Sequence, residues 1–147
     1  MREILFRGKR ILDNTWVYST GIWFGKNSEG NDTVDIYDGY GWKLIIPSTV
    51  GQFTGLLDKN SVKIFEGDVI KAHYANAKKA DHIETVVFKD GKYMAEFHFD
   101  NGTGKSWNTL PDRIQRVCFH WESPPIYMES CEVIGNIHNP ELLEEVC

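Results

Sequence analysis

The stretch GQFTGLLDKNSVKIFEGDVIKA, residues 51–72, decides how this chain is expected to fold. If its second half were one uninterrupted strand, Glu66 and Asp68 would share the inward face with Ile64. Burying two unpaired carboxylates costs several kcal/mol each, so the strand is expected to break at Glu66-Gly67-Asp68. Gly67 supplies the backbone freedom for the bend, and Asp68 can accept backbone N–H groups in a turn.

The acidic residues of this stretch, Asp58, Glu66 and Asp68, also admit a catalytic interpretation. However, a Gly-Asp step before an apolar strand is a common opening of strands in small SH3-like barrels, and here Gly67-Asp68 precedes the apolar VIKA. We therefore interpret Gly67 and Asp68 as a structural turn and predict no catalytic residue. A hydrolase that uses Glu66 and Asp68 with a divalent metal is the least favoured alternative.

Alternating apolar residues predict strands along most of the chain. The segment TWVYSTGIWF, residues 15–24, has a period of two and is expected to form one strand with a buried face. One parity holds Trp16, Tyr18, Ile22 and Phe24, and the other holds Val17, Ser19, Gly21 and Trp23. A loop rich in Gly, Asn, Asp and Ser is predicted from Gly25 to Asp35.

The clearest local element is IETVVFKDGKYMAEFHF, residues 83–99. Asp90-Gly91 predicts a type I′ hairpin turn, because both central positions of that turn need a positive φ. The resulting register pairs Phe88 with Tyr93 and Val86 with Ala95. Glu84 is expected at the rim of the apolar face that these pairs create.

The chain closes with a predicted strand, CEVIGNI, followed by HNPELLEEV at residues 138–146. Asn139 as N-cap and Pro140 at the first helical position predict a short C-terminal helix. No long-period repeat or low-complexity linker interrupts the sequence. We therefore predict a mostly β single domain over residues 1–147, with two intimately packed small barrels as the alternative.

Composition narrows the classes of function. The chain has 147 residues, and its formal net charge of −5 opposes association with nucleic acid. An apolar run of about 18 residues is absent, so no membrane span is expected. No apolar signal-peptide core is seen near the N-terminus, which predicts a cytoplasmic protein. The cysteines are then expected to be reduced thiols: Cys118, Cys131 and Cys147.

Two chemical motifs are incomplete. Gly-Lys-Ser at residues 104–106 matches the end of a phosphate-binding loop, but Phe99 stands where that motif needs a glycine. Cys118 and His120 would share a face of a strand, and Cys131 could approach them from a neighbouring strand, yet no pair with the usual spacing of zinc ligands accompanies them. We therefore predict neither a metal site nor a cofactor.

Three blocks of the sequence resemble the YopX family of phage and prophage proteins. They are REILFRGKRI with the following WVY, then VGQFTGLLDKNSVKIFEGDVI, and finally EVIGNIHNPELLEE. The resemblance implies a mostly β fold with SH3-like barrel elements, and a phage or prophage product expressed in the cytoplasm of a bacterial host. It supplies no enzymatic mechanism and no ligand. Ser61 and Ser19 replace glycines that are usual in the family, so the turn at Asn60-Ser61 is expected to be of a different type.

These observations favour a non-enzymatic accessory protein that binds another protein, and exposed strand edges also allow a homo-oligomer. The runner-up is a protein that binds single-stranded nucleic acid through basic and aromatic side chains. The candidate surface for either role comprises Arg7, Lys9, Arg10, Trp23, Tyr40 and Trp42.

Overall fold

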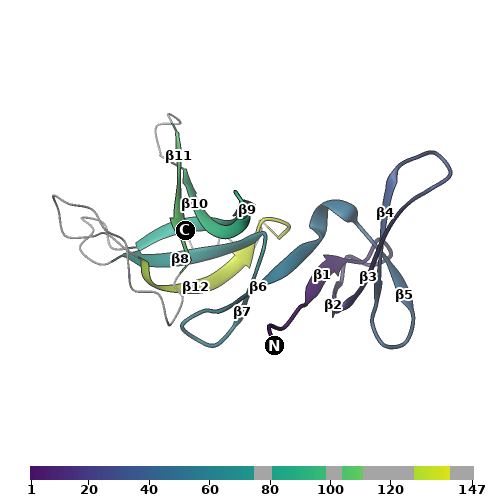
Figure 1. The fold of residues 1–147 in the computed structure, drawn as a ribbon, viewed down its shortest axis with the longest axis horizontal. Helices are drawn as coiled ribbons and strands as arrows, with labels where there is room; N and C mark the ends of the chain where they lie inside the picture. The colour runs from purple at the N-terminus through teal and green to yellow at the C-terminus, as the bar shows by residue number, and fades with distance from the viewer. Residues whose placement is uncertain (75–80, 99–103, 111–127, 140–147) are drawn as a thin grey trace. The chain divides into compact units, whose positions relative to one another are not determined.

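A computed structural model describes residues 1–74, 81–98, 104–110 and 128–139 of the chain. These residues form β-strands almost throughout, together with one short 3₁₀ helix, η1 (Pro47–Thr49) (Figure 1). The chain divides into two compact units, Met1–Gly55 and Leu56–Cys147. The single domain expected from the sequence stays a prediction.

The first unit is built from short antiparallel strands. They are β1 (Phe6–Lys9), β2 (Trp16–Ser19), β3 (Gly21–Lys26), β4 (Asp32–Tyr37), β5 (Trp42–Ile45) and the start of β6 (Gly51–Leu57). Strand β1 pairs with both β2 and β6, whereas β3, β4 and β5 form a separate three-stranded sheet with β4 in its centre. The predicted loop is therefore shorter than expected, since β4 already begins at Asp32.

The core of the first unit lies on one face of the three-stranded sheet. Its buried members are Val17, Val34, Ile36 and Ile45, with Ile22 and Val50 packed against them. Strand β1 approaches this core so closely that a Cβ atom at Gly8 would overlap the Ile45 side chain. A glycine is therefore needed at that point for the two strands to meet.

The prediction of one strand over residues 15–24 is wrong. Strands β2 and β3 belong to different sheets, and the Gly21 N–H donates to Ser19 Oγ at 3.0 Å in the bend between them. This bend shifts the alternation by one residue, so Val17 and Ile22 contribute to the same core although their parities differ. A period of two reports alternation within a strand but does not detect a change of sheet.

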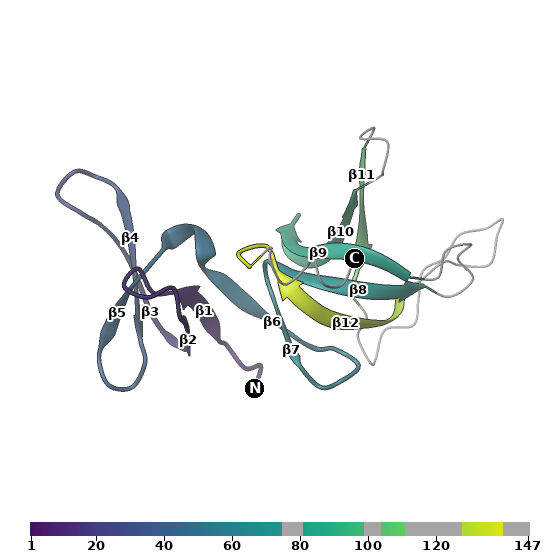
Figure 2. The same cartoon turned by 180° about the vertical axis from the view of Figure 1, so that it is seen from behind.

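The second unit contains a larger sheet. Its strands are β7 (Lys63–Phe65), β8 (Asp68–Tyr74), β9 (Asp81–Lys89), β10 (Lys92–His98), β11 (Lys105–Thr109) and β12 (Met128–Asn136). Five of them are ordered β11-β10-β9-β8-β12, and every neighbouring pair is antiparallel. Strand β12 is the last in sequence but lies beside β8, as both ribbon views show (Figure 2).

The predicted hairpin is confirmed. Asp90 and Gly91 have φ values of 51° and 79°, as a type I′ turn requires. The register is the expected one, with Phe88 opposite Tyr93 and Val86 opposite Ala95. The turn was predictable because its chemistry is local to two residues.

The core of the second unit gathers the inward residues of this sheet. It comprises Ile64, Ile70, Ala72, Tyr74, Val86, Ala95, Leu110, Met128 and Cys131. Cys131 is a buried thiol without a disulfide, as expected, whereas Cys118 and Cys147 lie outside the described residues.

The mostly β class is confirmed, but its finer description is not. None of the sheets formed by residues 1–74, 81–98, 104–110 and 128–139 closes into a barrel, so the SH3-like barrel elements are not confirmed. The predicted C-terminal helix falls on residues 140–147, which lie outside the described part of the chain. No helix within that part is long and apolar enough to cross a membrane.

Candidate functional site

The Glu66-Gly67-Asp68 segment has the geometry of a structural turn. Asp68 is buried, and its Oδ2 accepts the Phe65 N–H at 2.7 Å. Gly67 adopts a φ of +84°, where other residues are strained. Its N–H donates to the Val86 carbonyl at 2.8 Å, and its own carbonyl accepts the Ile137 N–H at 2.9 Å. The turn thus ties the start of β8 to β9 and to the segment that follows β12.

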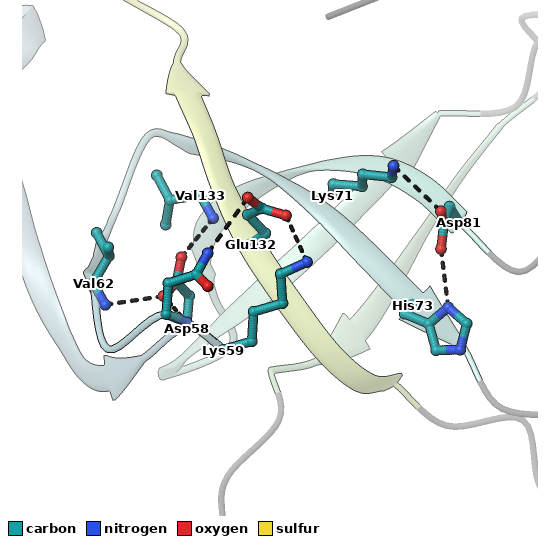
Figure 3. Close-up of polar contacts among 9 residues, drawn as sticks. Asp58, Lys59, Val62, Lys71, His73, Asp81, Glu132 and Val133 are labelled. Atoms are coloured by element: carbon teal, nitrogen blue, oxygen red, sulfur yellow. Dashed lines mark hydrogen bonds and ion pairs between the residues drawn. The ribbon is translucent and has the colours of Figure 1, made fainter.

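Asp58 has a structural role that the sequence analysis did not assign. Its side chain is 3% exposed, and Oδ1 accepts the N–H groups of Asn60 at 2.8 Å and Val62 at 2.9 Å. Its Oδ2 accepts the Val133 N–H of β12 at 2.9 Å (Figure 3). Ser61 completes this turn with a φ of 65°, a conformation that favours glycine. The Asp-x-Asn spacing is the signal that could have identified this side-chain turn.

The same turn carries an ion pair to β12. Lys59 Nζ lies 2.6 Å from Glu132 Oε2, and Asn60 Nδ2 donates to Glu132 Oε1 at 3.4 Å (Figure 3). Both partners of the ion pair are well exposed, so their contribution to stability is small. The turn is therefore fastened to the strand by the Asp58 carboxylate and by the Lys59 N–H, which donates to the Cys131 carbonyl at 2.9 Å.

Glu84 was expected at the rim of the hairpin and is instead 2% exposed. The hairpin alone would leave it at an edge, but β8 pairs with β9 and places Ile70 directly opposite it. The Tyr74 hydroxyl donates to Glu84 Oε1 at 2.7 Å within the core. Burial raises the pKa of Glu84, and the hydrogen bond from Tyr74 offsets only part of this effect.

The remaining chemical groups do not assemble a reactive centre within the described residues. Burial raises the pKa of the Cys131 thiol to about 11, so it stays neutral rather than forming the nucleophilic thiolate. No cluster of three or more His, Cys, Asp or Glu side chains in that part of the chain has the geometry to hold a metal ion. Lys105 begins β11, whereas a phosphate-binding Gly-Lys-Ser must open a helix.

The outer face of the β3-β4-β5 sheet exposes several large apolar side chains. Cross-strand pairing places Trp23, Asp35 and Leu44 in one row and Tyr37 and Trp42 in the next. We call these five residues the aromatic face. The exposed fractions of Trp23 and Trp42 are 66% and 57%, although the opposite face of the same strands is core.

A shallow depression in the aromatic face is lined by Trp23, Asp35 and Trp42. A Cβ atom at Gly25 would lie 3.3 Å from Trp23 Nε1, so the indole lies along the sheet beside that glycine. The Tyr37 and Trp42 rings contact each other at 5.5 Å between centroids. Two indoles from the outer strands thus flank one carboxylate from the central strand.

The predicted basic residues have local partners. Arg7 is 5% exposed, which removes it from the predicted surface. Its guanidinium lies 4.8 Å from the centre of the Trp16 ring, and the Lys9 ammonium lies 5.5 Å from the same ring. Arg10 forms an ion pair with Asp13 at 3.1 Å. These contacts bury or engage the cations on which a phosphate-binding surface would depend.

Of the predicted surface, only Trp23 and Trp42 line the depression. Tyr40 is 96% exposed in the turn between β4 and β5, where Asp38 Oδ1 accepts its N–H at 2.9 Å. The sequence analysis missed Asp35, because the predicted loop extended to that residue. Its alternation with Val34 and Ile36 was the signal for a half-buried strand.

Comparison with known proteins identifies a family but no activity. The crystal structure of protein EF1440 from Enterococcus faecalis is 21% identical, covers 97% of this chain and 99% of that one, and gives a TM-score of 0.48. No curated protein matches this chain. The family model described as YopX protein matches residues 5–144. Because this match covers nearly the whole chain, the protein belongs to the YopX family.

Proposed function

We propose that this chain is a phage or prophage accessory protein that acts by binding another protein through the aromatic face. The observation that carries the proposal is the exposure of Trp23, Tyr37, Trp42 and Leu44 together on one side of a three-stranded sheet. Tryptophan and tyrosine are enriched in protein interfaces, and a contiguous exposed apolar patch commonly marks such a site.

The roles of the buried acidic residues support a binding function over catalysis. Asp58 and Asp68 accept backbone N–H groups that hold turns together. The buried Glu84 is engaged by the Tyr74 hydroxyl within the core. Hydrolysis by Glu66 and Asp68 would require Asp68 to leave a bond on which the turn depends.

Single-stranded nucleic acid is the second candidate ligand, because bases stack on exposed aromatic rings such as Trp23, Tyr37 and Trp42. The Asp35 carboxylate in the centre of the aromatic face and the net charge of −5 both repel phosphate. An oligonucleotide titration by fluorescence anisotropy at low and moderate salt tests this candidate. Binding that weakens steeply with salt and is lost in Trp23→Ala would favour it over a protein partner.

The main test is capture of partners from induced lysogens with the full chain immobilised, after nuclease treatment. We expect a protein that is retained by the wild type and by Tyr40→Ala, but lost with the Trp23→Ala/Trp42→Ala double variant. Tyr40 is the matched control because it is an exposed aromatic residue outside the depression. Equal melting temperatures would show that the double variant is folded.

Retention of the same partner by the folded double variant would contradict the proposal. Light scattering on the purified chain covers the case in which the partner is a second copy. A dimer that dissociates on the double substitution would replace the heterologous partner by a homo-oligomer.

A further inference from the structure

We propose that the depression between Trp23 and Trp42 is the seat of an arginine side chain presented by the protein partner, with its charge against Asp35. This inference rests on the proposed function, because it specifies the chemistry of the partner at the same surface. It starts from the placement of Asp35, directly opposite Trp23 on the neighbouring strand.

Among the described residues, no cation pairs with the carboxylate of Asp35. Within residues 1–74, 81–98, 104–110 and 128–139, no hydrogen bond or ion pair involves its oxygens. The lysines of the same sheet pair with other acids: Lys26 Nζ lies 2.5 Å from Asp32, and Lys43 Nζ lies 3.6 Å from Asp38. Asp35 is half-buried, so water solvates its charge less well than that of a fully exposed acid.

The aromatic neighbours of Asp35 define what can complement it. An indole face attracts a cation through its quadrupole, and tryptophan is the best such ring. A guanidinium is planar, so it stacks on an aromatic face while it donates two hydrogen bonds to a carboxylate. The depression offers both partners at once, with the indoles of Trp23 and Trp42 and the carboxylate of Asp35 lining the same shallow space.

The same arrangement selects against other ligands. A phosphate would meet the negative charge of Asp35, and a purely apolar side chain would cover that carboxylate without pairing it. An ammonium could bind, but it lacks the planar shape that stacks and pairs together. A protein segment with a protruding arginine is therefore the occupant that uses every group in the depression.

Titration of the full chain with N-acetyl-arginine methylamide, followed by the indole N–H signals in NMR spectra, tests the seat directly. We expect saturable shifts of the Trp23 and Trp42 signals, assigned with Trp23→Phe and Trp42→Phe. Asp35→Asn should weaken this binding roughly tenfold, since it removes the ion pair but keeps the shape. Tyr40→Ala should bind as the wild type does.

The neutral citrulline analogue has nearly the same shape as arginine and provides the control probe. Equal shifts with citrulline, unchanged affinity in Asp35→Asn, or no saturable shift with the arginine probe would each overturn the cation seat. A stronger response to the corresponding lysine probe would also overturn the choice of arginine.

Partner capture separates the failure of this inference from that of the proposed function. Loss of the partner in both Asp35→Asn and the double tryptophan variant supports both the proposed function and the arginine seat. Loss in the tryptophan variant alone overturns the arginine seat but leaves the binding surface standing. Retention in both folded variants overturns the proposed surface, whereas the NMR titration still decides whether the depression binds a guanidinium.

Discussion

Asp58 in the second unit and Asp35 in the first are both aspartates held on β-structure, but they have opposite surroundings. Asp58 is almost fully buried and accepts three backbone N–H groups. Asp35 is half-buried beside two indoles, and its carboxylate receives no hydrogen bond from the described residues. Burial of a carboxylate is therefore evidence of function only where N–H donors of the same chain do not already account for it. The deeper aspartate holds a turn to a strand, and the shallower one is the carboxylate that we propose binds a partner.

Replacement of Asp58 should give the largest effect. Asp58→Ala removes the acceptor of three N–H groups and is expected to lower the free energy of unfolding by about 3 kcal/mol. Asp35→Ala is the matched control and should change that free energy by less than about 0.5 kcal/mol. Urea unfolding of both variants measures the difference. Similar losses in the two proteins would break the comparison, because Asp35 would then also be structural.

The turn before β8 should show a smaller loss. Gly67→Val forces a β-branched residue to a φ of +84° and is expected to cost about 2 to 3 kcal/mol. Asp68→Ala removes one buried bond to the Phe65 N–H and should cost about 1 to 2 kcal/mol. Thermal and urea unfolding measure both. If a folded Asp68→Ala protein of unchanged melting temperature lost partner binding, Asp68 would join Asp35 among the functional carboxylates.

Glu84 is a third buried carboxylate, and it should make the free energy of unfolding depend on pH. This change in stability should be the smallest of those predicted. Burial raises its folded pKa above the usual 4.5, so the folded state holds a proton that the unfolded state releases. Its contribution to stability is therefore fully present below pH 4.5 and is lost as pH rises through the folded pKa. Glu84→Gln cannot titrate, so its stability relative to the wild type should rise from pH 4 to pH 7.

Denaturant melts at several pH values follow that difference. A constant offset between Glu84→Gln and the wild type would show that burial does not shift the carboxyl group. The slope is the quantity that tests the prediction, because any difference in packing between Gln and the acid contributes the same free energy at every pH.

Local chemistry explains which parts of the fold were predictable. The hairpin at Asp90-Gly91 and the break at Gly67 depend on two or three neighbouring residues, and both lie where the sequence indicated. The change of sheet after Ser19 depends on which strand each segment pairs with, which alternation alone does not encode. Glu84 was misplaced for the same reason, since its burial comes from β8 rather than from its own hairpin.

The candidate site was predictable only in part. Trp23 and Trp42 were predicted as part of a surface and are exposed. However, the sequence does not say which face of a three-stranded sheet meets a core. The burial of Arg7 was not predicted, because its contact with Trp16 requires β1 and β2 to pair. Asp35 becomes a candidate binding residue only because the fold places it beside Trp23 and Trp42.

The position of β12 beside β8 has a consequence for how the chain folds during synthesis. The bond from the Val133 N–H to Asp58 Oδ2 joins residues 75 positions apart, and it forms only after β12 has left the ribosome. Until then, β8 presents an unpaired strand edge while β9 and β10 can already close their hairpin. Such long-range closure is slow and leaves a nascent chain open to mispairing. Asp58 therefore stabilises a strand pairing that forms only after β8, β9 and β10 have been synthesised.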